Sequence, residues 1–195
     1  MRGIETEYIH EIEIKKSKFI ALIVPVYHVD DVKKKLEQVK KDYPGATHYC
    51  YAYILLQEKR CSDDGEPSKT AGQPILNVLE KQQLSYVLAI VIRYFGGIKL
   101  GAGGLVRAYT NAVIQVLEKA HIYPMGLKKH IKVTFSYEFE QQFLKQYSSF
   151  EIIQKTYLDI VTYEGYLDEE KIASLLQQKH VHVEILESCY RILKD

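Results

Sequence analysis

Apolar residues recur along the chain with two periods, and these periods predict its secondary structure. The N-terminal part alternates weakly, and a basic turn at 15–18 separates it from a second strand over 19–26. Helical spacing predicts a helix over 30–41, which Asp30 can cap. Alternation resumes over 48–56 and predicts a third strand.

The next stretch changes from polar to strongly apolar. A polar loop over 57–69 precedes a helix, whose start is indicated by a capping box formed by Thr70 and Gln73. The nearly all-apolar run over 86–92 predicts a buried strand, and helical spacing is found again from Leu105 onward. The first part of the chain is therefore predicted to have the element order ββαβαβα.

A second group of elements follows a break in the pattern. Pro124 and Gly126 interrupt the helical spacing, so we expect a linker over 121–129. Beyond it we predict a strand, a helix, two strands, a helix and a strand, over 131–135, 138–147, 151–155, 157–163, 168–179 and 181–186. The order βαββαβ is that of a ferredoxin-like sandwich. We therefore expect an α+β protein with domains over 1–125 and 126–195.

Composition narrows the class of protein. With 47% hydrophobic and 26% charged residues the chain is typical of soluble globular proteins, and its net charge of +1 does not by itself indicate nucleic-acid binding. No run approaches the roughly 18 apolar residues of a membrane helix, and the N-terminus lacks the apolar core of a secretion signal. Cys50, Cys61 and Cys189 form no C-x-x-C pair, which favours a reducing, cytoplasmic environment. We expect no cofactor, no metal, no membrane association and no DNA specificity.

The strongest candidate for chemistry is a glycine-rich loop between the buried strand and the last helix of the first domain. Glycine lets a ligand approach the backbone closely, and a helix start offers unpaired N–H groups to an anion. Basic residues bracket this loop. We therefore predict an anion-binding site for an RNA phosphate or a small ligand, formed by Arg93, Gly96, Gly97, Lys99, Gly101, Gly103, Gly104 and Arg107.

The glycine spacing does not fit the two common phosphate-binding motifs. Val106 stands where the dinucleotide fingerprint has its third glycine, and Ala102 and Gly103 stand where a P-loop has Lys and Ser or Thr. A standard NAD or P-loop nucleotide site is thus improbable. The simpler alternative is that these glycines only permit a tight turn and close packing of the helix on the sheet.

An acidic loop is the second candidate. Asp63, Asp64 and Glu66 could bind a hard cation or act as general acid and base, which makes them weak catalytic candidates. A solvated turn is the more ordinary interpretation, and a carboxylate–arginine latch is a third if the fold brings Arg93 nearby. The residues of this motif loop are Asp63, Asp64, Gly65, Glu66, Pro67, Thr70 and Gly72.

A row of tyrosines on the third strand admits two interpretations. Tyr49, Tyr51 and Tyr53 alternate on one face, where they could stack unpaired RNA bases. Aromatic residues that alternate along a half-buried strand more often pack against a neighbouring element.

The two loops also carry a family resemblance. Residues 63–76 and 93–109 resemble the signature of the IMPACT/YigZ family, and residues 16–20 and 48–53 are similar to its N-terminal pattern. The resemblance covers about the first 120 residues, and the C-terminal part is similar in layout to the small second domain of bacterial YigZ-type members. Lys69 departs from the pattern, in which we expect glycine.

The resemblance implies a fold and a set of partners. It implies a ribosomal-protein-type N-terminal domain followed by a ferredoxin-like domain, a pairing similar to domains IV and V of elongation factor G. It also implies translation regulation, since the eukaryotic relatives bind a partner in the amino-acid-starvation kinase pathway. We therefore expect a non-enzymatic protein that contacts RNA, the ribosome or a translation-related protein partner. The alternatives are a hydrolase or transferase acting on a phosphorylated small molecule at the glycine loop, and a protein–protein interaction module without nucleic acid.

Overall fold

The first unit of the protein is built on a five-stranded antiparallel sheet. The computed structural model describes residues 1–193 and divides the chain into two compact units, Met1–Pro124 and Met125–Asp195. Each unit is described by itself. In the order in which they pair, the strands of the first unit are β2 (Tyr8–Ile14), β3 (Ser17–Pro25), β6 (Val87–Tyr94), β4 (His48–Ile54) and β5 (Lys59–Ser62).

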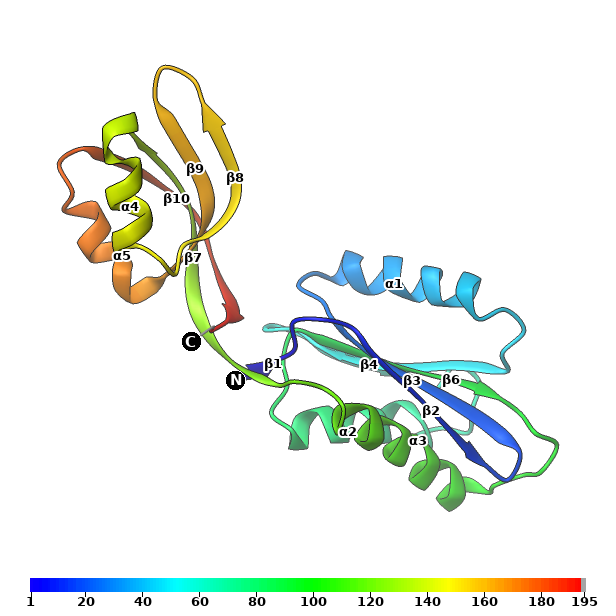
Figure 1. The fold of residues 1–195 in the computed structure, drawn as a ribbon. Helices are drawn as coiled ribbons and strands as arrows, with labels where there is room; N and C mark the ends of the chain where they lie inside the picture. The colour runs from blue at the N-terminus through cyan, green and yellow to red at the C-terminus, as the bar shows by residue number, and fades with distance from the viewer. Residues whose placement is uncertain (194–195) are drawn as a thin grey trace. The chain divides into compact units, whose positions relative to one another are not determined.

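Helices cover both faces of this sheet. Helix α1 (Val29–Asp42) lies on one face, and α2 (Gly72–Lys81) and α3 (Ala102–Leu117) lie on the other (Figure 1). The side chains of β6 alternate between the two layers, so that Leu88 packs on the α1 side and Val91 on the side of α2 and α3. Because both faces are buried, β6 is apolar at almost every position, as its sequence predicted.

The order ββαβαβα is present, with two short strands added. Strand β5 lies inside the predicted polar loop over 57–69, and β1 (Arg2–Gly3) pairs with the start of β7. The cap predicted at Asp30 is wrong, because α1 begins at Val29 after His28. The Asp31 carboxylate accepts the N–H group of His28 at 2.9 Å.

The start of α2 is capped from a distance. The capping box predicted for Thr70 and Gln73 is wrong, because the Thr70 hydroxyl donates to a carbonyl three residues earlier, at 2.6 Å. Asp63 caps the helix instead, since its Oδ1 accepts the N–H groups of Ala71 at 3.0 Å and Gly72 at 2.8 Å. Asp63 therefore fixes where the helix starts.

The second unit has the ferredoxin-like connectivity predicted from the sequence. Its elements are β7 (Tyr123–Phe135), η1 (Tyr137–Phe139), α4 (Glu140–Gln146), β8 (Glu151–Tyr157), β9 (Val161–Asp168), α5 (Glu169–Leu176) and β10 (Val181–Ile192). The strands are antiparallel in the order β10-β7-β9-β8, and an aromatic-rich core joins the sheet to the two helices. None of the helices within residues 1–193 is long and apolar enough to cross a membrane.

The stretch 121–129, predicted as a linker, contains the division between the two units, but most of it is strand. Strand β7 begins at Tyr123 and continues through Pro124 and Gly126, because β1 and β10 pair with this stretch. The second strand of the central hairpin is also displaced, since it begins at Val161 rather than at 157. Pairing with neighbouring strands decided these boundaries, and a single sequence does not contain that information.

Lys69 occupies a backbone conformation that suits glycine, with φ +63°. A side chain in the left-handed region is strained by its Cβ atom, so we predict that Lys69→Gly raises the free energy of unfolding by about 1 kcal/mol. Lys69→Ala is the matched control, because it removes the charge and keeps the strained Cβ. Urea unfolding that shifts equally in both variants would count against backbone strain as the cause.

Two glycines of the glycine-rich loop are predicted to respond oppositely to alanine. A Cβ at Gly96 would lie 1.9 Å from the carbonyl oxygen of Lys16, whereas a Cβ at Gly103 meets nothing within 4 Å. We expect Gly96→Ala to lower the free energy of unfolding by at least about 3 kcal/mol. Gly103→Ala should leave it unchanged or raise it by up to about 1 kcal/mol. Equal effects in urea titrations would show that close packing at Gly96 is not the constraint.

Candidate functional site

At one edge of the first sheet, polar side chains follow the apolar residues that α2 and α3 cover. Alternation along the three central strands places Ser17, His48 and Arg93 on the face that α2 and α3 cover. Each lies at or next to the end of its strand, and His48 pairs directly with Arg93. The sheet therefore presents three polar groups at the point where its apolar cover stops.

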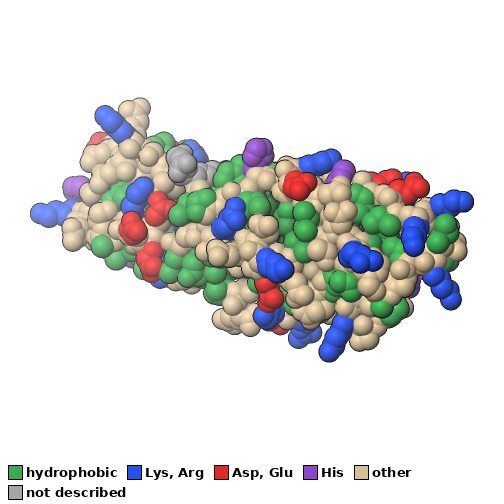
Figure 2. Space-filling model, turned by 90° about the horizontal axis from the view of Figure 1, so that it is seen from below, with side chains coloured by type: hydrophobic (Ala, Val, Ile, Leu, Met, Phe, Trp, Pro, Cys, Tyr) green, Lys and Arg blue, Asp and Glu red, His purple; other side chains and the backbone are tan. Residues whose placement is uncertain are grey.

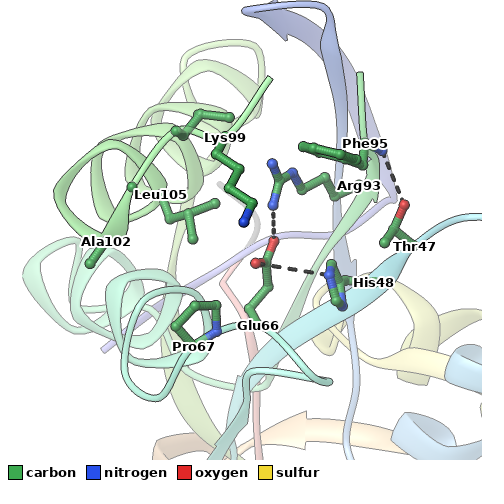
Figure 3. Close-up of a pocket in the computed structure, with 11 residues that line it drawn as sticks. Thr47, His48, Glu66, Pro67, Arg93, Phe95, Lys99, Ala102 and Leu105 are labelled. Atoms are coloured by element: carbon green, nitrogen blue, oxygen red, sulfur yellow. Dashed lines mark hydrogen bonds and ion pairs between the residues drawn. The ribbon is translucent and has the colours of Figure 1, made fainter. Parts of the chain in front are cut away.

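The acidic loop and the glycine-rich loop meet at this edge and enclose a pocket of about 390 Å³. Glu66 enters it from the acidic loop, and Lys99 enters it from the glycine-rich loop (Figure 3). Its lining residues are Thr47, His48, Glu66, Pro67, Arg93, Phe95, Lys99, Leu100, Gly101, Ala102 and Leu105. Two motifs that are far apart in sequence thus form one site.

A buried ion pair joins the two loops. Arg93 Nη1 donates to Glu66 Oε1 at 2.5 Å, and their side chains are only 5% and 3% exposed. The Tyr109 hydroxyl donates to the same oxygen at 2.8 Å, which connects α3 to the pair. Rings of Phe19 and Phe95 lie 5.4 and 5.3 Å from the guanidinium carbon. The structure contains the carboxylate–arginine latch that the sequence left as an alternative.

One thiol and one hydroxyl lie behind the ion pair, and both remain protonated. The Cys50 thiol lies 3.0 Å from the Asp63 carbonyl oxygen and 3.3 Å from the Tyr109 hydroxyl, and it can donate its one proton to either. Burial raises the pKa of Cys50 to about 12. Burial, together with the neighbouring Cys50 and Glu66, also raises the pKa of Tyr109 well above its usual value. Tyr109 therefore stays a hydrogen-bond donor to Glu66, and Cys50 is not a thiolate nucleophile near neutral pH.

The other carboxylate oxygen of Glu66 faces the pocket beside His48. Nδ1 of His48 donates to the Asp64 carbonyl at 2.7 Å, so in the neutral ring Nε2 is an acceptor. Nε2 lies 3.9 Å from Glu66 Oε2, too far for a direct hydrogen bond. Within residues 1–193, Oε2 accepts no hydrogen bond. This wall of the pocket presents two acceptors to whatever enters.

Donor groups lie on the opposite wall. The amine of Lys99 points into the pocket toward Glu66 and Arg93 in Figure 3, and it pairs with no acid among the described residues. Helix α3 begins beside it at Ala102, and Gly101 precedes the helix with φ +73° and provides no side-chain cap. The N–H groups of Ala102 and Gly103 are among the first of the helix and lack intrahelical partners. This wall is suited to an anion.

The predicted anion-binding residues separate into two places. Arg107 lies outside the pocket, in a neighbouring hollow of about 280 Å³ that also contains Lys15 and Asn111, with Leu100 between the two. Arg93 lines the pocket but is committed to Glu66, so our expectation that it contacts phosphate from the surface is wrong. Within the pocket, Lys99 and the start of α3 are the predicted groups that remain available.

The acidic candidates also separate. Asp63 caps α2, and the Asp64 carboxylate accepts the N–H group of Tyr49 at 2.6 Å, so both are used by the main chain. Glu66 is the one that lines the pocket. Within residues 1–193 no group of three His, Cys, Asp or Glu side chains is arranged to hold a metal ion. The structure therefore gives Asp63 and Asp64 contacts to main-chain N–H groups and does not place either in the pocket.

The glycines of the acidic loop have structural roles. Gly65 has φ +86°, and the main chain of Ser62 lies so close to Gly72 that a Cβ there would be 2.7 Å from it. Pro67 lines the pocket beside Glu66. The loop thus brings Glu66 to the pocket through tight turns that favour glycine.

The tyrosine row packs instead of presenting a stacking surface. Tyr53 is 3% exposed, and Tyr49 and Tyr51 pack against the same core under α1. Of the two interpretations of the tyrosine row, the structure therefore supports packing and not base stacking. The sequence missed His48, Phe95 and Tyr109 as site residues. Alternation could have placed His48 on the α2–α3 face, but only the folded loops show that Phe95 lies at the pocket rim.

Known proteins match this chain over the part that carries both loops. The model of the Impact N-terminal domain matches residues 15–117, which include both loops. IMPACT family member YvyE of Bacillus subtilis (strain 168) is 36% identical over 167 residues, covering 83% of this chain and 77% of that protein. YigZ of Escherichia coli (strain K12) is 42% identical over 112 residues, and the match spans 55% of each chain.

A solved structure has the same fold over nearly the whole length. The crystal structure described as that of a hypothetical protein is 28% identical, with a TM-score of 0.66, and the match covers 95% of this chain and 97% of that one. The family resemblance of the two loops is thus confirmed by an independent domain model and by relatives. The chain belongs to the IMPACT family.

Proposed function

We propose that this chain is a non-enzymatic binding protein linked to translation, and that it binds RNA at the pocket between the two motif loops. The observation that supports it is the wall formed by Lys99 and the uncapped start of α3, which offers unpaired donors to a phosphate. The link to translation rests on the family resemblance and on the two-domain order similar to elongation factor G.

The surface around the pocket extends the cationic character. The β2–β3 turn packs on the glycine-rich loop, where the N–H group of Gly96 donates to Ser17 Oγ at 3.2 Å. This contact brings the exposed Lys15 and Lys16 beside the loop. Within residues 1–193, neither of them, nor Arg107, pairs with an acid. Figure 2 shows Lys and Arg side chains gathered over this end of the first unit, at the right of the view. An RNA backbone leaving the pocket meets further positive charge here.

An enzyme acting on a phosphorylated small molecule is the second candidate. The pocket volume of about 390 Å³ falls within the usual range for small ligands, and Glu66 and His48 are neighbours in it. Among the described residues no activated nucleophile is evident at the pocket: Cys50 is buried and protonated, and the hydroxyls of Ser17 and Thr47 accept N–H groups. Binding is therefore the better-supported function.

A salt series with a single-stranded RNA oligonucleotide tests the proposed function. Lys99→Ala and Arg107→Ala should each weaken binding, and each should reduce the slope of log affinity against log salt by about 0.7 to 1, the value for one lost phosphate contact. Lys81→Ala is the matched control, since Lys81 is equally exposed but lies at the far end of α2. Slopes unchanged in both variants, or reduced as much in the control, would place the RNA elsewhere.

An incubation with phosphorylated small molecules and Mg²⁺ separates binding from catalysis. The binding proposal predicts that no phosphate or other product is released from nucleotides or sugar phosphates over hours. Product formed by the wild-type chain and lost in Lys99→Ala would favour the enzyme instead. A pull-down repeated after nuclease treatment tests the remaining alternative, because a partner that survives nuclease is held by protein contacts.

A further inference from the structure

The pocket has two chemically different walls, and within residues 1–193 the side-chain groups that face it from each wall make no direct hydrogen bond. Glu66 Oε2 and His48 Nε2 are acceptors on one side, and Lys99 and the start of α3 are donors on the other. A simple anion would satisfy only the donor wall. The ligand that fits both carries an anionic group together with a neutral hydrogen-bond donor.

The acceptor wall calls for a hydrogen-bond donor on the ligand. The Glu66 side chain is 3% exposed, and one of its oxygens has no hydrogen bond within residues 1–193. Oε2 opens onto the pocket and is not enclosed by protein, so a hydrogen-bond donor that enters the pocket can reach it. The gap of 3.9 Å to His48 Nε2 leaves this oxygen open to a hydroxyl from the pocket. A sugar hydroxyl has the required chemistry.

The rim supplies a third element, an exposed aromatic ring. Phe95 is 45% exposed, although its N–H group is fixed by Thr47 Oγ1 at 3.0 Å. The Arg93 guanidinium lies 5.3 Å from the ring and supports it from inside. An exposed ring held on a rigid backbone is the usual platform for stacking an unpaired base.

We infer that the pocket holds one nucleotide of single-stranded RNA, with its base on Phe95, its 2′-hydroxyl on Glu66 and its phosphate at Lys99 and the start of α3. This inference rests on the proposed function. It adds that the site distinguishes single strands from duplexes and RNA from DNA. A duplex keeps its bases stacked inside, so Phe95 selects single strands. A deoxynucleotide has no 2′-hydroxyl, so DNA leaves Glu66 Oε2 without a donor.

Changes on the ligand test the hydroxyl contact without disturbing the protein. Fluorescence anisotropy would compare wild-type affinity for RNA, DNA and 2′-O-methyl RNA of one sequence at one salt concentration. All three carry the same phosphates. DNA lacks the hydroxyl, and the methyl ether keeps its oxygen but cannot donate. We expect RNA to bind about tenfold more tightly than either, the effect of one hydrogen bond to a charged group.

Changes on the protein test the stacking contact. Phe95→Ala should weaken binding of the RNA about tenfold, the typical loss of one stacked base. Ile98→Ala is the matched control, because Ile98 is an apolar residue of the same loop that is 42% exposed and does not line the pocket. Glu66 is left unchanged, because the buried Arg93 depends on it for folding.

The outcomes separate this inference from the proposed function. Equal affinity for the three oligonucleotides, or equal effects of Phe95→Ala and Ile98→Ala, would overturn the inference that the pocket holds one nucleotide in this way. The dependence on Lys99 and Arg107 would still stand in that case. Binding of ribonucleoside monophosphates without binding of oligonucleotides would overturn the assignment to RNA. Absence of binding by any of these ligands would overturn both.

Discussion

The buried ion pair between Glu66 and Arg93 is the interaction on which the site depends. It joins a loop after β5 to the end of β6, and Tyr109 ties the same carboxylate to α3. A buried pair adds little net stability, but losing one partner leaves an uncompensated charge and costs about 3–5 kcal/mol. The pair therefore fixes how the two loops meet. It also removes Arg93 from direct recognition, because its charge is neutralised inside the protein.

The glycine-rich loop combines two roles that the sequence alone left as alternatives. Gly96 lies against the main chain of the β2–β3 turn and leaves no room for a side chain, whereas Gly103 sits in open space at the helix start. Close packing therefore explains one end of the loop. At the other end, Gly101 and the first turn of α3 keep their N–H groups accessible at the pocket wall. The proposed recognition would thus use a loop that is fixed at one end by close packing.

Much of the fold could be predicted from the sequence, and the reasons for success and failure are physical. Period-two alternation along β6 is a local property, so it places Arg93 on the α2–α3 face without a structure. The cap of α2 could not be predicted, because Asp63 lies eight and nine residues before the N–H groups that it accepts. The position of Phe95 at the pocket could not be predicted either, because it depends on how the glycine-rich loop folds. Contacts between distant segments set these features, and periodicity does not record them.

We propose the pocket between the two loops as the place where RNA binds. The most direct measurement is a titration of the ¹⁵N-labelled protein with single-stranded RNA, followed by the chemical shifts of assigned backbone amides. Binding in the pocket predicts that the largest shifts fall on Phe95, Lys99, Ala102 and Gly103, with small shifts in the second unit. Shifts confined to the second unit, or to the α1 face of the first sheet, would contradict it.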